Sequence, residues 1–146
     1  MNNKKINKII QEIEDYLADT NKHLPVDEDA LKNQKDKQYV ISFILEQIAN
    51  ESVNLANHIA SELDLETPNS SKEVFDVLAK ANIITKENSD KMKDLISIRN
   101  VIAHRYTNIS FEILAENVNN LGYVEDFLNQ INKKLNSMDN KKAGKT

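Results

Sequence analysis

The chain of 146 residues contains no cysteine and no tryptophan, and it has only two glycines and two prolines. Without cysteine it can form no disulfide, no thiolate zinc site and no cysteine nucleophile. So few glycines and prolines leave little material for tight hairpins, and the low aromatic content argues against an aromatic-rich β-sandwich. These absences predict an all-α protein. The apolar spacing along the chain then predicts an up-and-down bundle of about five helices with one long central helix.

Arginine is also nearly absent, although basic residues are common. Seventeen of the nineteen basic residues are lysine, and the two arginines, Arg99 and Arg105, flank His104, with Tyr106 just beyond. A planar guanidinium, an imidazole that titrates near neutral pH and a phenol are a set suited to phosphate chemistry. The stretch 99–106 is therefore the candidate functional site.

Length and charge set the broad class of the protein. The length fits a single domain, expected over residues 1–138, followed by a disordered polar tail over residues 139–146. No apolar run is long enough to span a bilayer and no secretory segment is recognised, so we expect a cytoplasmic protein. The net charge of −4 argues mildly against broad nucleic-acid binding. Between Thr85 and Tyr106, however, five basic residues face three acidic ones, which predicts a locally positive helix.

Apolar spacing and capping residues divide the chain into helices. The expected helical spans are 4–21, 30–63, a short helix through 74–81, 86–106 and 111–137. Ser70 and Glu73 are spaced as a capping box before the short helix. Thr85 and Ser110 are the expected N-caps of the last two helices.

The long helix has apolar residues on more than one of its faces. Over residues 39–48 seven of ten positions are apolar, which predicts burial on two sides. One side would pack in the bundle of the chain itself. The other side is expected to contact a second copy of the chain, because closed homodimers are the commonest oligomers.

The helix over residues 86–106 carries a charge in an apolar stripe. On a helical wheel Met92, Leu95, Ile98 and Ile102 lie on one side together with Arg99. Asn100 and His104 are four residues apart and lie on another side. An arginine within an apolar stripe must be paired or must face a wet cleft.

These residue types suit one reaction in particular. RNA is cut without a metal ion when its own 2′-hydroxyl attacks the adjacent phosphorus, which needs a base, an acid and positive charge. Histidine at neutral pH suits the first two roles, and the arginine fork suits the third. One histidine cannot easily serve both ends of the scissile bond, so a two-fold dimer that pairs two helices in one cleft is expected.

A purely structural interpretation is open beside this one. Arg99 could pair with Glu46 or Glu51 as a buried contact. The charge of His104 would be favourable near a helix C-terminus, and Tyr106 could simply end the apolar stripe.

The pattern Arg99-x4-His104-x-Tyr106 resembles the R-x4-H-x-Y signature of HEPN-domain proteins, particularly the HepT-like toxins of MNT/HEPN toxin–antitoxin pairs. Asn100 matches the polar residue that commonly follows the family arginine. The resemblance covers roughly residues 30–135, because the long helix, the short helix and the motif helix follow in the order of the family.

The resemblance implies a dimeric, metal-independent endoribonuclease toxin of a type II- or VII-like toxin–antitoxin pair, with no cofactor and with its active site between protomers. Arg99 and His104 would be the catalytic pair, and Asn100 would orient or contact the phosphate. The partner would be an MNT-type nucleotidyltransferase antitoxin that adenylylates Tyr106, which adds negative phosphate and bulk to the cleft.

Two other classes of function are compatible with the same sequence. The chain could be a non-catalytic HEPN module that binds a nucleotide or serves its nucleotidyltransferase partner. It could also be a structural helical adaptor.

Overall fold

The computed structural model describes residues 3–104 and 110–144, with only the helical backbone described for His104 and residues 141–144. Every regular element in these ranges is an α-helix, which confirms the predicted all-α class. The helices are α1 (Asn3–Asn21), α2 (Glu28–Asn33), α3 (Lys35–Glu62), α4 (Glu73–Lys80), α5 (Lys86–His104), α6 (Phe111–Val118) and α7 (Gly122–Gly144).

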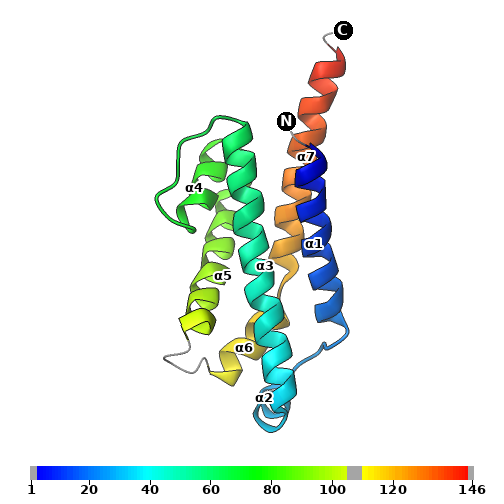
Figure 1. Cartoon of the computed structure of the whole chain (residues 1–146), viewed down its shortest axis with the longest axis vertical. Helices are drawn as coiled ribbons and strands as arrows, with labels where there is room; N and C mark the ends of the chain where they lie inside the picture. The colour runs from blue at the N-terminus through cyan, green and yellow to red at the C-terminus, as the bar shows by residue number, and fades with distance from the viewer. Residues whose placement is uncertain (1–2, 105–109, 145–146) are drawn as a thin grey trace.

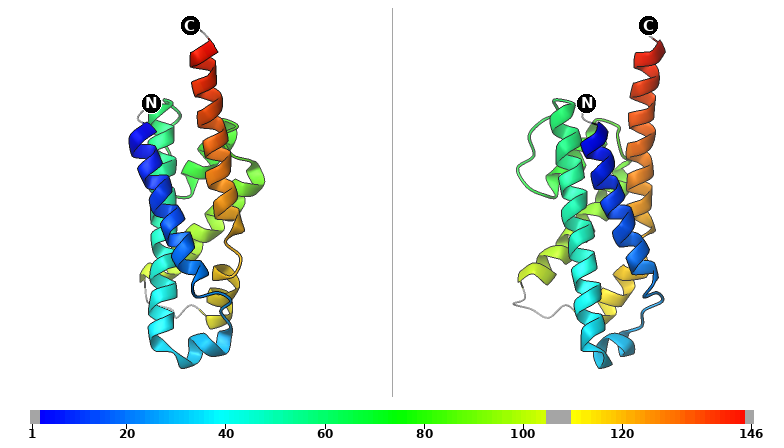
Figure 2. Two further views of the ribbon diagram at one scale, coloured as in Figure 1. Left: turned by 90° about the vertical axis from the view of Figure 1, so that its right-hand side faces the viewer. Right: turned by 45° about the vertical axis from the view of Figure 1, so that its right-hand side comes forward.

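The long helix α3 runs through the centre of the bundle (Figure 1). Helix α1 packs along one flank of α3, and α4 and α5 pack on the other. Helix α5 crosses α3 at an angle instead of running parallel to it (Figure 2). Helices α2 and α6 pack against each other at one end of the bundle, and α7 extends past α1 at the opposite end. One continuous cluster of buried apolar residues holds these helices together.

The helix expected over residues 30–63 is divided in the structure into α2 and α3. Gln34 between them is extended, with φ −125° and ψ 93°, although no glycine or proline marks the break. Leu31 of α2 is fully buried, and α2 packs on both α3 and α6. The expectation of one unbroken helix was therefore wrong, because burying this short apolar face requires the chain to change direction.

The helix expected over residues 111–137 is also two helices. Asn119 lies in the break, where its side-chain oxygen accepts a hydrogen bond from Val26 N at 3.0 Å and its side-chain nitrogen donates to Val26 O at 2.6 Å. A loop far away in sequence thus holds the junction. Helix α7 then continues to Gly144, so it does not end near Ser137, and residues 139–144 of the expected disordered tail are helical.

The expected capping residues are largely confirmed. The hydroxyl of Thr85 accepts from Asn88 N at 3.1 Å, and that of Ser110 accepts from Ile113 N at 3.0 Å. Before α4 the capping box is displaced by one residue. Ser70 accepts from Glu73 N as expected, but the Glu73 carboxylate accepts from Asn69 N.

Four leucines at seven-residue spacing pack in the core. Leu114, Leu121, Leu128 and Leu135 are all buried. Near them an edge-to-face ring pair joins α4 to α7, with the centroids of Phe75 and Phe127 5.6 Å apart. Within the described part of the chain, no helix has the length and apolarity required to cross a membrane.

The burial of Tyr123 predicts that the fold loses stability at alkaline pH. Burial, and secondarily the negative charge of Asp94, raise the pKa of Tyr123 to about 12. In the unfolded chain the phenol of Tyr123 ionises near pH 10. The stability that this side chain contributes is therefore complete below about pH 10 and is lost as the pH rises through the pKa of the folded protein. The free energy of unfolding in urea should fall by about 1.3 kcal/mol more in wild type than in Tyr123→Phe between about pH 9 and about pH 11. Parallel pH curves for the two proteins would contradict this.

Candidate functional site

The buried face of α5 differs by part of a turn from the predicted stripe. Met92 and Leu95 are fully buried as expected, but Ile98 and Ile102 are only half-buried. Ile96, which the stripe left out, is fully buried instead. The reason is that α5 packs against three helices, α3, α4 and α7, so its buried face is wider than one stripe and is centred closer to Arg99.

Arg99 lies at the end of this face and is half-buried. Its Nη1 donates a hydrogen bond to Oδ1 of Asn50 on α3 at 3.1 Å. Its Nε and Nη2 both donate to Oδ1 of Asn100, at 3.1 Å and 2.8 Å. The helical wheel placed Arg99 and Asn100 on different sides of the helix, but the long arginine side chain reaches its neighbour and the structure brings the two together.

Both partners of Arg99 are neutral amides. In the part of the chain that the structure describes, no carboxylate forms an ion pair with this guanidinium, so the alternative of a structural pairing with Glu46 or Glu51 is not found there. Glu51 instead lies near Glu12 of α1, and burial together with this second carboxyl raises the pKa of Glu51. Three of the five guanidinium N–H groups are used. The remaining donors and the full charge are available to an anion.

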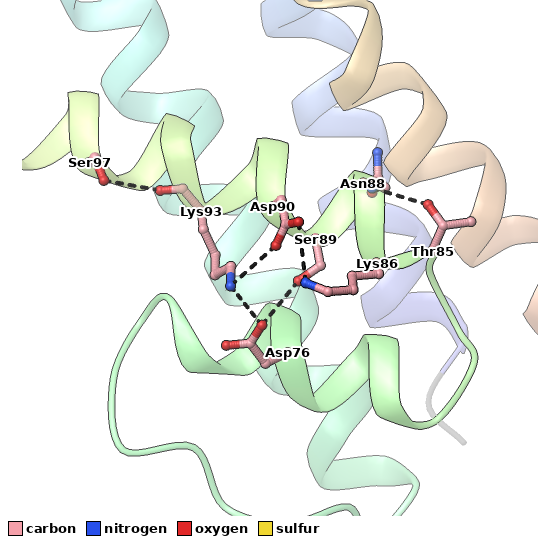
Figure 3. Close-up of polar contacts among 8 residues, drawn as sticks. All are labelled: Asp76, Thr85, Lys86, Asn88, Ser89, Asp90, Lys93 and Ser97. Atoms are coloured by element: carbon pink, nitrogen blue, oxygen red, sulfur yellow. Dashed lines mark hydrogen bonds and ion pairs between the residues drawn. The ribbon is translucent and has the colours of Figure 1, made fainter.

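The lysines of α5 are paired with carboxylates, in contrast to Arg99. Figure 3 shows two of them, Lys86 and Lys93, with their acidic partners. Lys93 pairs with Asp76 of α4 at 2.8 Å and with Asp90 at 3.4 Å, and the hydrogen bond that Lys93 donates to Asp76 raises the pKa of Lys93. Lys86 and Lys91 pair with carboxylates of their own helix, each at 3.4 Å. The predicted local positive charge of this helix is therefore offset at its three lysines, in part by Asp76, which lies outside the counted span.

His104 is the last described residue of α5. Its side chain lies outside the described residues, as do Arg105 and Tyr106. The expected proximity of His104 to Asn100 and the role of Tyr106 therefore stay predictions.

Asn50 is the residue that sequence reasoning missed. It lies in the middle of α3 and is half-buried, 49 positions from the arginine that it contacts. The only sequence signal is a polar residue directly after the buried pair Ile48 and Ala49. That signal indicates a polar partner but not which one.

An apolar patch on α3 is left exposed to solvent. It consists of Tyr39, Val40 and Phe43, with exposed fractions of 65%, 39% and 55%. We call these three residues the α3 patch. At helical spacing Tyr39 and Phe43 share a face of α3 with Asn50, whereas Ile41, Ile44 and Leu45 are buried in the chain's own core. The apolar residues over 39–48 thus fall into two sets. One set is buried in the bundle, and the other, the α3 patch, is exposed.

No group of three or more histidine, aspartate or glutamate side chains that could hold a metal ion is found among residues 3–104 and 110–144. The chemistry that the described residues themselves offer is anion recognition by Arg99 with the amides of Asn50 and Asn100.

Comparison with known proteins identifies the family. The family described as Ribonuclease HepT-like matches residues 6–131, which include Asn50 and the whole motif. The chain belongs to the HepT-like ribonuclease family. The expectation of a HEPN-type protein is confirmed.

Individual HepT-like relatives agree with this assignment. The mRNA nuclease HepT of Shewanella oneidensis is 32% identical over 83 residues, which are 57% of this chain and 61% of that protein. The aligned part therefore spans less than two thirds of this relative. A solved structure of the tri-AMPylated HEPN toxin of Shewanella oneidensis in complex with MNT antitoxin has a TM-score of 0.81 at 26% identity, covering 88% of this chain and 96% of that one.

A more distant neighbour supports the fold alone. YutE of Bacillus subtilis, a cytosolic protein of unknown function, has a TM-score of 0.81 at 18% identity and covers 94% of this chain and 93% of its own. The helical arrangement of this chain is thus also found in a protein whose sequence differs widely from it.

Proposed function

We propose that this HepT-like protein is an endoribonuclease toxin that cuts RNA by attack of the 2′-hydroxyl on the adjacent phosphorus, in a cleft between two protomers. The observation that carries the proposal is the environment of Arg99, whose guanidinium is held by two neutral amides and is not paired with a carboxylate in the described chain. A fixed and uncompensated guanidinium favours a phosphate. The relative named mRNA nuclease HepT supports RNA as the source of that phosphate.

The roles follow from the chemistry of each group. Arg99 binds two non-bridging oxygens and stabilises the charge of the phosphorane. His104 in one protomer takes the proton of the 2′-hydroxyl, while a second histidine gives a proton to the departing 5′-oxygen. The products are a 2′,3′-cyclic phosphate and a 5′-hydroxyl. Asn100 contacts or orients the phosphate, and neither a metal ion nor another cofactor takes part.

The second histidine is supplied by a second copy of the chain. The α3 patch supports this homodimer, because three adjacent large apolar residues on one helix are uncovered and such patches commonly mark interaction sites. Asn50 shares the helix face of the patch, so an interface over the patch extends toward Arg99. The site of one protomer is then half of the working cleft.

The proposed partner is an MNT-type nucleotidyltransferase antitoxin that adenylylates Tyr106. One structural neighbour of this chain is a tri-AMPylated HEPN toxin in complex with MNT antitoxin. AMP groups on a residue next to the phosphate site would bring negative charge to the guanidinium and repel RNA. A toxin that acts on messenger RNA works in the cytoplasm.

The test is cleavage of an mRNA transcript by purified, unmodified protein in excess EDTA. Wild type should cut, and Arg99→Ala should cut about a hundredfold more slowly because it lacks the charge that stabilises the transition state. Specific activity should fall on dilution as the dimer dissociates. Absence of cleavage by wild type, together with retained binding of a nucleotide, would instead support the non-catalytic module.

A further inference from the structure

Asn50 belongs to α3 and not to the motif helix, yet it is one of the two groups that hold Arg99. Its neighbours Ile48, Ala49 and Ser52 are completely buried in the bundle. The backbone of Asn50 is therefore fixed by the core, and α3 and α5 are in direct contact. The hydrogen bond from Arg99 Nη1 at 3.1 Å ties the guanidinium to α3, the long helix at the centre of the bundle (Figure 1).

The second partner of Arg99 cannot provide this restraint. Asn100 is the next residue on the same helix, so its hydrogen bonds at 2.8 Å and 3.1 Å fix the guanidinium only relative to α5. Among the described residues, the bond to Asn50 is the hydrogen bond that joins the guanidinium to another helix of the bundle. An arginine side chain that is otherwise free would lose rotamer entropy each time it bound a phosphate.

The side chain of Asn50 is neutral, and this matters for Arg99 as much as the position of Asn50 does. On the same helix Lys93 is anchored by the carboxylate of Asp76 at 2.8 Å, and its charge is compensated by that contact. Arg99 is anchored by an amide, which offers an acceptor oxygen with no net charge. A carboxylate at position 50 would hold the guanidinium equally well but would cancel the charge that a phosphate needs.

We propose that Asn50 is a positioning residue that holds Arg99 for a phosphate of the RNA backbone while leaving its charge uncompensated. The inference rests on the proposed ribonuclease function. It adds a requirement that the motif does not contain, namely that the group at position 50 be a hydrogen-bond acceptor and be neutral.

Asn50→Asp tests both requirements, because aspartate has the same size and keeps the acceptor but adds a negative charge. The matched control is Asn57→Asp, the same change on the same face of α3 two turns away, at an exposed asparagine. Affinity is measured by fluorescence anisotropy with a 2′-O-methyl oligoribonucleotide, which cannot be cut, over a series of salt concentrations. Cleavage is measured with an mRNA transcript.

Asn50→Asp should melt at or above the temperature of wild type, yet it should bind the oligonucleotide about tenfold more weakly. The slope of log affinity against log salt should decrease in magnitude by about 0.7, as for the loss of one phosphate contact to a single strand. Asn57→Asp should match wild type in affinity and slope. In an Arg99→Ala background, Asn50→Asp should have no further effect.

Asn50→Ala separates anchoring from charge. It should leave the salt slope unchanged but lower kcat about tenfold, because the guanidinium is no longer held in place. Wild-type kcat in Asn50→Ala, wild-type affinity in Asn50→Asp, or an equal loss of affinity in Asn57→Asp would each overturn the inference. If Arg99→Ala itself cuts and binds RNA like wild type, the proposed function fails, whatever the Asn50 variants show.

Discussion

Replacing His104 with alanine should lower the rate of RNA cleavage at neutral pH by about 10²–10⁴-fold, the usual contribution of a general acid or base. Each cleft of the proposed dimer needs one imidazole to accept a proton and one to donate it. The substitution removes both from every cleft, because the two copies are identical. RNA affinity should change little, since Arg99 supplies the phosphate contact.

The rate is best measured by single-turnover cleavage of an mRNA transcript in EDTA at several pH values. Wild type should show a dependence on pH in the range where histidine side chains commonly ionise, and His104→Ala should not. The chain offers two matched controls, His23→Ala and His58→Ala, which remove half-buried histidines outside the motif. If His104→Ala cuts as fast as wild type, or if a control is equally impaired, the assignment of His104 is wrong.

Tyr106→Phe should eliminate AMP transfer altogether, because phenylalanine keeps the ring but has no acceptor oxygen. In the transfer, the phenol oxygen of Tyr106 bonds to the α-phosphorus of ATP, pyrophosphate leaves and the phenol proton is released to solvent. Co-expression with a cognate MNT-type nucleotidyltransferase, followed by intact-mass measurement, should show added AMP on wild type and none on the variant. The variant should remain an active ribonuclease that the antitoxin no longer silences by modification.

Tyr16→Phe is the control for this experiment, because it makes the same change at a half-buried tyrosine that lies outside both the motif and the α3 patch. It should gain AMP like wild type. Added mass that persists in Tyr106→Phe would move the acceptor elsewhere. Loss of cleavage in Tyr106→Phe would show that the phenol takes part in the reaction and is more than a site of modification.

The sequence alone determined the class of the fold, the position of the motif and, to within one residue, both ends of α1 and α4 and the starts of α5 and α6. These features depend on near neighbours. Thr85 and Ser110 bond to the backbone three residues ahead, and the leucines of the last two helices recur at a fixed spacing. Because such interactions are settled within one or two turns, their patterns can be found without knowing where the rest of the chain lies.

Only the tertiary structure decided where two helices break and what surrounds Arg99. Asn119 bonds to Val26 across 93 positions, Lys93 to Asp76 across 17 and Arg99 to Asn50 across 49. No local pattern encodes these pairings, because each depends on how two buried helix faces align. The sequence showed that Arg99 needed a partner. The packing of α5 on α3 decided that the partner is a neutral amide, and so left the charge of the arginine available for a phosphate.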